Sequence, residues 1–83
     1  MTTIINQIKK FTTFDLGLAA ALISVDYKLI SLERIAQNKV QFVFYFTDDI
    51  NKASEDYWSN TLQVKARTYF DNLKALKNRI YSN

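Results

Sequence analysis

The chain has 83 residues, of which 48% are hydrophobic, and carries a formal net charge of +3. It contains no cysteine and no histidine, which excludes disulfides and thiolate metal sites and removes the commonest general base and zinc ligand. This length fits one small domain, and the moderate positive charge permits an anionic partner without requiring one.

The apolar runs of the sequence fit neither a membrane-spanning helix nor a secretory signal. No apolar run is long enough to span a bilayer, and the lysines at positions 9 and 10 follow the apolar Ile4-Ile5 pair instead of preceding it, as they would in a secretory signal. We therefore expect a cytoplasmic protein. Residues 1–10 are predicted to form an N-terminal arm or short helix, and residues 11–83 a single compact domain.

The clearest element is a strand over residues 40–46. Side chains alternate between the two faces of a strand, so Val40, Phe42, Phe44 and Phe46 point the same way. β-branched and aromatic residues favour such a half-buried surface. We predict that this segment is the central strand and that its alternate rings lie in the core.

The first half of the chain predicts a strand, a helix and a second strand. Residues 11–14 read as a short strand, and Asp15 is placed to cap a helix over 16–25. That helix is apolar almost all round, which predicts burial on more than one side. One strip of it contains only small residues, which indicates close packing against a neighbour: Gly17, Ala20, Ala21 and Ser24.

A hairpin is predicted next. The second strand covers 27–34, with Ile30 and Leu32 expected on one face, and the turn covers 36–39, where Asn38 is the best candidate for positive φ. This turn would join the second strand to the central strand in antiparallel fashion.

Two helices complete the prediction. Asp48 or Thr47 would cap a helix over 49–58, and residues 61–65 would form an extended segment or edge strand. The last helix, over 66–81, shows a continuous apolar stripe: Ala66, Tyr69, Phe70, Leu73, Leu76 and Ile80. The order β-α-β-β-α-(β)-α predicts an α+β fold, with a small, mainly antiparallel sheet and helices packed on it.

The second face of the predicted sheet is also partly apolar. We expect Tyr27, Leu29, Val43 and Tyr45 to share it, and an exposed apolar face often marks an interaction site. Three covers are open: the C-terminal helix of the chain itself, a second copy of the chain, or a ligand. These four residues are the predicted partner-binding surface.

Several motifs resemble a small uncharacterised bacterial and phage family of unknown function. They are F-T-T-F-D-L-G-L-A-A-A-L from Phe11, V-Q-F-V-F from Val40 and D-Y-W from Asp56; the family pattern is F-x-T-x-D-L-x-L-A-A-x-L, G-Y-x-L, V-x-F-x-F, Y-W. Asp26 stands where the family usually has glycine. The resemblance implies one compact α+β unit and no particular chemistry, and its frequent setting near phages and mobile elements favours nucleic-acid or anti-host work.

The residues predict no catalytic, metal or cofactor site. Asp15 and the Asp48-Asp49 pair are explained as helix starts, and Asp71 as a helical partner of Arg67 and Lys74. No Gly-rich phosphate loop is present, and the possible Ser and Thr nucleophiles lack an evident base.

Two non-enzymatic functions therefore compete. The favoured one is a binding or accessory module that acts through protein association, as a homodimer or docked on a larger effector. The alternative is nucleic-acid binding, because the order of elements resembles that of RNA-recognition domains, in which sheet aromatics such as Tyr45 and Tyr27 stack on bases. The chain lacks the glycines of that signature. The basic residues of this alternative are Lys28, Lys39, Lys65, Arg67 and Lys74.

Overall fold

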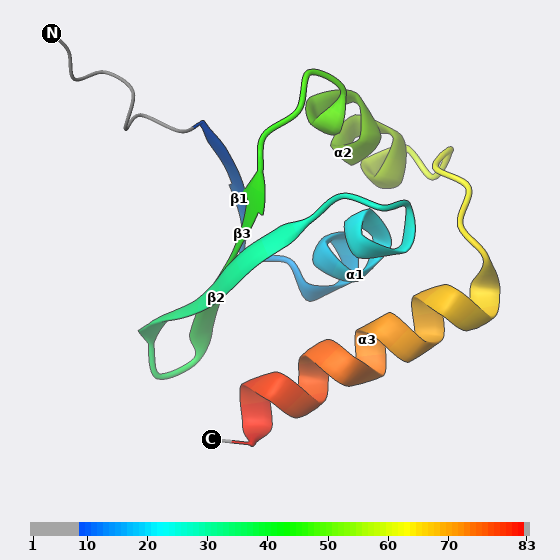
Figure 1. Ribbon diagram of the computed structural model, residues 1–83. Coiled ribbons are helices and arrows are strands. Elements are labelled where there is room, and N and C mark those ends of the chain that lie inside the picture. The colour runs from blue at the N-terminus through cyan, green and yellow to red at the C-terminus, as the bar shows by residue number, and fades with distance from the viewer. Residues whose placement is uncertain (1–8, 83) are drawn as a thin grey trace, which may run out of the picture.

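A three-stranded antiparallel sheet and three helices make up the computed structural model, which describes residues 9–82 (Figure 1). The elements are β1 (Lys10–Thr13), α1 (Leu16–Ser24), β2 (Leu29–Ala36), β3 (Lys39–Tyr45), α2 (Ile50–Trp58) and α3 (Ala66–Tyr81). The predicted α+β class is confirmed. The predicted arm at residues 1–10 lies outside the described residues except for Lys9 and Lys10, and Lys10 begins β1.

The sheet has the order β1-β3-β2, so the predicted central strand is confirmed. Phe42 and Phe44 are at most 1% exposed and lie in one cluster with Leu18, Ile50 and Leu76, one residue from each helix. All three helices therefore pack on the Phe42 side of the sheet. Alternation along β3 placed these rings in the core, as predicted.

Helix α1 is the middle of the core. The Asp15 carboxylate accepts a hydrogen bond from the Leu18 amide at 2.8 Å, which confirms the predicted N-cap. Leu18 to Leu22 are all buried, because the sheet lies on one side of α1 and α3 on another (Figure 1). A helix that is apolar almost all round fits this position.

The small residues of α1 pack closely, as predicted. A methyl group added at Gly17 would overlap with the Tyr57 hydroxyl, and the Tyr69 hydroxyl donates to the Gly17 carbonyl at 3.4 Å. One turn further along α3, the Asn72 amide donates to the Ser24 hydroxyl at 3.0 Å. Side chains from α2 and α3 thus occupy the space that larger side chains on α1 would need.

Helix α1 ends at a residue with left-handed backbone conformation, which was not predicted from the sequence. Asp26 has φ 73°, its amide donates to the Ile23 carbonyl, and the Tyr27 amide donates to the Leu22 carbonyl, both at 3.0 Å. This pair of bonds is a Schellman motif, whose left-handed position is usually glycine.

A bulge in β2 changes the faces of that strand. Leu29 pairs with Phe44, but Ser31 pairs with Val43, so Ile30 is an extra residue. Leu29 and Leu32 therefore lie on the core face, and Ile30 is exposed. The prediction that Ile30 and Leu32 share a face is wrong, because strict alternation does not hold across a bulge.

The hairpin turn also differs from the prediction. Gln37 and Asn38 connect β2 to β3, but among residues 9–82 only Asp26 and Asn60 have positive φ without being glycine. Two-residue turns favour positive φ because it matches the twist of the strands. A second register shift, between Arg34 and Ala36, adds local twist just before the turn, and we attribute the ordinary φ of Asn38 to it.

The predicted cap and edge strand near α2 are wrong. The N-cap position is Asp49, which makes no side-chain capping bond because its carboxylate accepts from the Thr47 hydroxyl at 2.8 Å. Residues 61–65 form no strand. The amides of Thr61 and Leu62 instead donate to the Asp56 carbonyl at 2.8 and 3.0 Å, so the chain folds back over the end of α2.

Helix α3 begins and ends where predicted. Leu76 is buried, and Tyr69, Leu73 and Ile80 pack against the core. Phe70 is the exception: it is more than half exposed, with the Lys74 ammonium 5.4 Å from its ring. None of the helices within residues 9–82 is long and apolar enough to cross a membrane.

Candidate functional site

The four residues of the predicted partner surface do not share a face. Leu29 lies opposite Phe44 on the core side, and Tyr27 also packs against the core. Only Val43 and Tyr45 lie on the outer face, and Val43 is 4% exposed whereas Tyr45 is 49% exposed. The β2 bulge is the cause, because it moves Leu29 to the other side of the sheet.

The outer sheet face nevertheless carries an exposed tyrosine with a lysine on either side. Tyr45 pairs with Lys10 of β1, and its amide donates to the Lys28 carbonyl at 3.1 Å. Directly paired residues project to the same face, so Lys10 and Lys28 stand on either side of an exposed phenol ring. In the next row, Val43 lies between Thr12 and Ser31.

The other predicted basic residues are dispersed. The Lys39 ammonium lies 4.5 Å from the Phe14 ring, and Lys74 covers Phe70. Lys65 precedes α3, and Arg67 pairs with Asp71 at 3.5 Å on the exposed side of that helix. The structure does not bring the predicted set of lysines and arginines to one surface.

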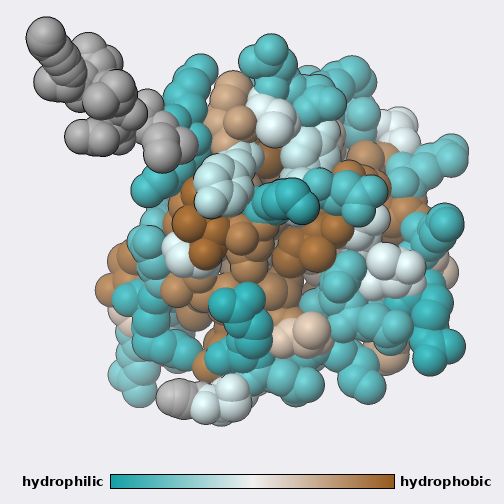
Figure 2. Space-filling view, in the orientation of Figure 1, coloured by the Kyte–Doolittle hydropathy of each residue, from teal (hydrophilic) through white to brown (hydrophobic). Residues whose placement is uncertain are grey.

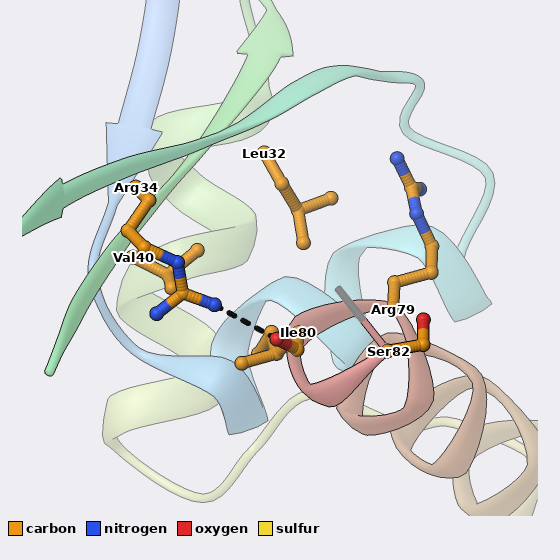
Figure 3. A pocket seen from close by; sticks show the side chains of 6 residues that line it. All are labelled: Leu32, Arg34, Val40, Arg79, Ile80 and Ser82. Carbon is orange, nitrogen blue, oxygen red and sulfur yellow. Dashed lines mark hydrogen bonds between the residues drawn. The ribbon is translucent and has the colours of Figure 1, made fainter. Parts of the chain in front are cut away.

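One concave surface of the molecule is a groove to which no sequence signal pointed. It lies between the β2–β3 hairpin and the C-terminal end of α3, and consists of two adjoining hollows of about 450 and 340 Å³. Leu32, Val40 and Ile80 supply apolar walls (Figure 3). In the space-filling view, apolar side chains form a band along β2 and towards the helices (Figure 2).

Arg34 spans this groove. Its Nη2 donates to the Ile80 carbonyl at 2.8 Å and its Nη1 to the Gln37 carbonyl at 3.1 Å (Figure 3). The Ile80 carbonyl belongs to the last turn of α3, whose carbonyls have no partner within the helix and form the negative end of its dipole. Arg34 thus joins the hairpin to α3, a contact between residues 46 positions apart.

The rim of the groove combines exposed aromatic rings with positive charge. Phe14 is 50% exposed and Tyr81 79% exposed. Arg79 stands across Leu32 from Arg34 (Figure 3). Within residues 9–82 the ion pairs are Lys52–Asp56 and Arg67–Asp71, so neither arginine of the groove has a carboxylate partner in that part of the chain.

Four of the eight acidic residues lie at the other end of the molecule. Positions 47–61 contain four carboxylates and one lysine, whereas positions 74–82 contain three cations and no carboxylate. Helix α2 lies at the top of Figure 1, and the hairpin turn and the end of α3 lie at the bottom. Carboxylates therefore outnumber cations around α2, whereas the last turns of α3 carry cations alone.

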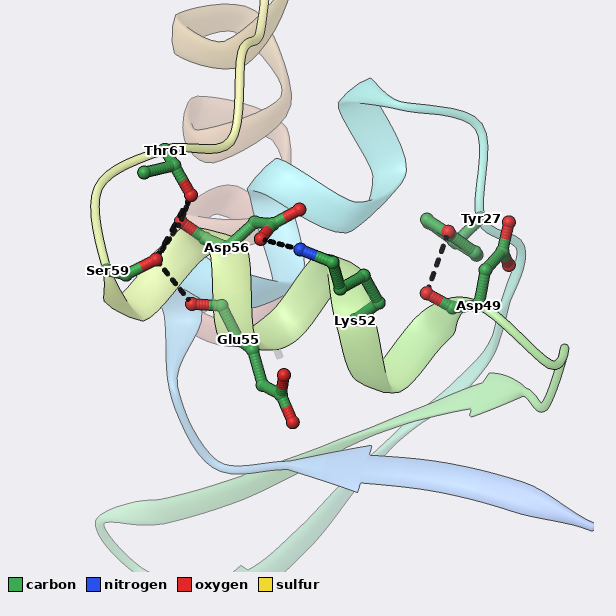
Figure 4. A network of polar contacts seen from close by, with 7 residues as sticks. All are labelled: Tyr27, Asp49, Lys52, Glu55, Asp56, Ser59 and Thr61. Carbon is green, nitrogen blue, oxygen red and sulfur yellow. Dashed lines mark hydrogen bonds and ion pairs between the residues drawn. The ribbon is translucent and has the colours of Figure 1, made fainter.

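The α2 region is internally connected by polar contacts (Figure 4). The Tyr27 hydroxyl donates to the Asp49 backbone carbonyl at 3.3 Å, and Lys52 pairs with Asp56 at 2.7 Å. Burial, followed by the nearby Asp49, raises the pKa of Tyr27. Tyr27 is thus engaged in holding the start of α2.

In the described part of the chain, no three Asp, Glu, His or Cys side chains lie close enough to hold a metal ion together. The groove offers apolar walls, two guanidinium groups and aromatic rings, which are groups suited to binding another molecule.

A family model described as "Domain of unknown function (DUF5659)" matches residues 8–82. The chain belongs to the DUF5659 family. The match covers every strand and helix of the structure, and it confirms the expected membership of a family of unknown function. Comparisons with curated proteins and with solved structures give no match. The DUF5659 match therefore gives the extent of the domain but no function. A proposal about its function has to rest on the surface of the molecule.

Proposed function

We propose that this DUF5659 protein is a non-enzymatic binding module that acts through protein–protein association, and that the partner docks in the groove between the hairpin and α3. The observation that carries the proposal is the combination of apolar side chains in the groove, those of Leu32, Val40 and Ile80, with exposed aromatic rings at its rim. Contiguous exposed apolar surface commonly marks a protein contact, and aromatic and arginine side chains supply most of the energy at such contacts.

The groove is also held in shape. Arg34 bonds the hairpin to the last turn of α3, and the core residues Phe42 and Leu76 anchor the strand and the helix behind it. A preformed site loses less conformational entropy on binding than a flexible one. The chain contains no cysteine, and proteins without disulfides are typical of the cytoplasm. We therefore propose that the module acts there.

Site-specific photo-crosslinking in the producing cell tests the proposal. A photoreactive amino acid replaces Tyr81 at the groove or, as the matched control, Tyr45 on the outer sheet face. Both positions are exposed aromatic residues, so substitution leaves the core intact. We expect nuclease-resistant protein adducts from position 81 and few from position 45. Adducts from position 45 alone, or from neither position, would refute docking in the groove.

A homodimeric form of the proposal is tested separately by light scattering. If the groove binds a second copy of the chain, the apparent molecular mass rises from that of a monomer to that of a dimer as the protein concentration increases. The adducts from position 81 then contain only this protein. A monomer at every concentration, with adducts to another protein, assigns the groove to a different partner.

The outer sheet face supports nucleic-acid binding as a second candidate. The specific observation is the exposed Tyr45 between Lys10 and Lys28, since an aromatic ring can stack on a base while flanking lysines neutralise phosphates. Labelled single-stranded oligonucleotides at low salt provide the test. Binding should weaken with salt and with Tyr45→Ala, and should be unaffected by Tyr81→Ala. The absence of measurable binding at low salt would eliminate this candidate.

A further inference from the structure

We infer that the segment bound in the groove is acidic and apolar: a stretch of a partner protein in which Asp or Glu flanks an aliphatic or aromatic side chain. This inference rests on the proposed function, and adds the chemistry of the partner to it. It follows from the arrangement of Arg34, Leu32 and Arg79, in which two guanidinium groups stand on either side of an apolar wall (Figure 3).

The arginines retain unused donors. A guanidinium group has five N–H donors, and Arg34 uses two of its nitrogens on the carbonyls of Ile80 and Gln37. Arg79 makes no ion pair within residues 9–82. Guanidinium groups bind carboxylates through paired, charge-assisted hydrogen bonds, so this rim matches an acidic ligand.

The apolar residues of the two hollows favour an apolar group in the bound segment. Leu32, Val40 and Ile80 line the larger one, whose volume of about 450 Å³ is within the range of small-ligand pockets. The smaller one continues beside Phe14 and Tyr81. Filling these hollows removes apolar surface from water, which is the main favourable term in protein association.

Other occupants fit less well. The apolar side chains of Leu32, Val40 and Ile80 offer no polar partner to a sugar–phosphate chain, which favours a protein segment over nucleic acid. Residues 1–8 of the chain carry no carboxylate. The carboxylates of α2 on a second copy are partly engaged, since Asp56 pairs with Lys52 and Asp49 accepts from Thr47. A head-to-tail contact between copies would also form rings or open chains and not a dimer.

Selection from a random peptide display library against the full-length protein tests the inference. We expect the selected peptides to be enriched in Asp and Glu next to Leu, Ile, Phe or Trp, and to bind less tightly as salt increases. Arg79→Glu should weaken their binding roughly tenfold or more, because it replaces an attraction by a repulsion. Arg67→Glu is the matched control, an arginine on the same helix outside the groove, and should leave the affinity unchanged.

The failures are distinguishable. Selected peptides that depend on the groove but lack carboxylates, or that bind Arg79→Glu as well as the unmodified protein, would overturn the acidic partner and leave docking in the groove standing. A library that yields no peptide would overturn it too. Competition by an oligonucleotide with the same sensitivity to Arg79→Glu would reassign the site to nucleic acid. If no crosslinks form from position 81, by contrast, the proposed function itself is refuted.

Discussion

Phe42 sits at the middle of the central strand, with Thr13 and Leu32 paired on either side. Its ring is buried among residues of the helices, so Phe42→Ala should cost about 3–5 kcal/mol of unfolding free energy. Phe70→Ala is the matched control, because that ring is exposed, and should change stability by about 0.5 kcal/mol or less. Urea unfolding measures both. A loss below about 1 kcal/mol for Phe42→Ala would contradict the inward orientation of the strand.

Asp26 is the residue at which the backbone and the side chain conflict most. With φ 73° it occupies a conformation that disfavours most L-residues, so Asp26→Gly should stabilise the protein by about 0.5–1 kcal/mol, even after the entropy that glycine adds to the unfolded chain. Asn60→Gly is the control, since Asn60 has φ 64° at the end of α2 but, unlike Asp26, places no carboxylate at the negative end of a helix dipole. Thermal unfolding that shows a loss for Asp26→Gly would refute the reading of the Schellman motif.

Tyr57 should make stability fall at alkaline pH. Burial and then the Tyr69 hydroxyl raise the pKa of Tyr57 from 10.0 to about 12. Because the folded state binds this proton more tightly, the contribution of Tyr57 is fully present below pH 10 and is lost as the pH rises towards 12. Phenolate absorbance and urea unfolding across this window should show a late-titrating tyrosine that Tyr57→Phe removes. The same alkaline loss in Tyr57→Phe would contradict the assignment.

At the scale of elements, the junction between β2 and α3 depends on Arg34. Arg34→Met keeps the length of the side chain but removes the bond to the Ile80 carbonyl, which should destabilise the end of α3 by about 1 kcal/mol and speed amide exchange in its last turn. Arg67→Met, on the exposed Arg67–Asp71 pair, should have almost no effect, because exposed ion pairs contribute little. Equal exchange in the two variants would show that Arg34 does not hold the helix end.

Local patterns were sufficient to predict most elements. The alternation in β3, the Asp15 cap and the apolar stripe of α3 each express a rule that acts within a few residues. The bulge at Ile30 does not, because Leu29, Ile30 and Leu32 offer apolar side chains to either register. The partner surface predicted from that register was consequently divided between two faces.

The groove could not be predicted in the same way. Arg34 and Ile80 are 46 positions apart, and nothing in the neighbourhood of either residue identifies the other. Arg34 reads in the sequence as an ordinary charge on a strand. Its contact with the helix end arises only when α3, packed on α1, brings its last turn beside the hairpin.

The whole molecule presents two distinct surfaces. The outer sheet face is mixed in character, with Val43 enclosed by Thr12 and Ser31 and with Tyr45 between two lysines. The groove combines apolar side chains with polar ones and carries two arginines, and it lies at the opposite end of the molecule from the carboxylates of α2. These differences predict that a partner protein binds in the groove and not on the outer sheet face, and that its affinity falls as the salt concentration rises.

Methyl NMR of the protein bound to a selected peptide distinguishes the two surfaces most directly. The methyl groups of Leu32 and Ile80 line the groove, and those of Val43 mark the outer sheet face. We predict that the signals of Leu32 and Ile80 shift on binding and that those of Val43 do not. Shifts confined to Val43, with Leu32 and Ile80 unchanged, would contradict the proposal that the molecule acts through its groove.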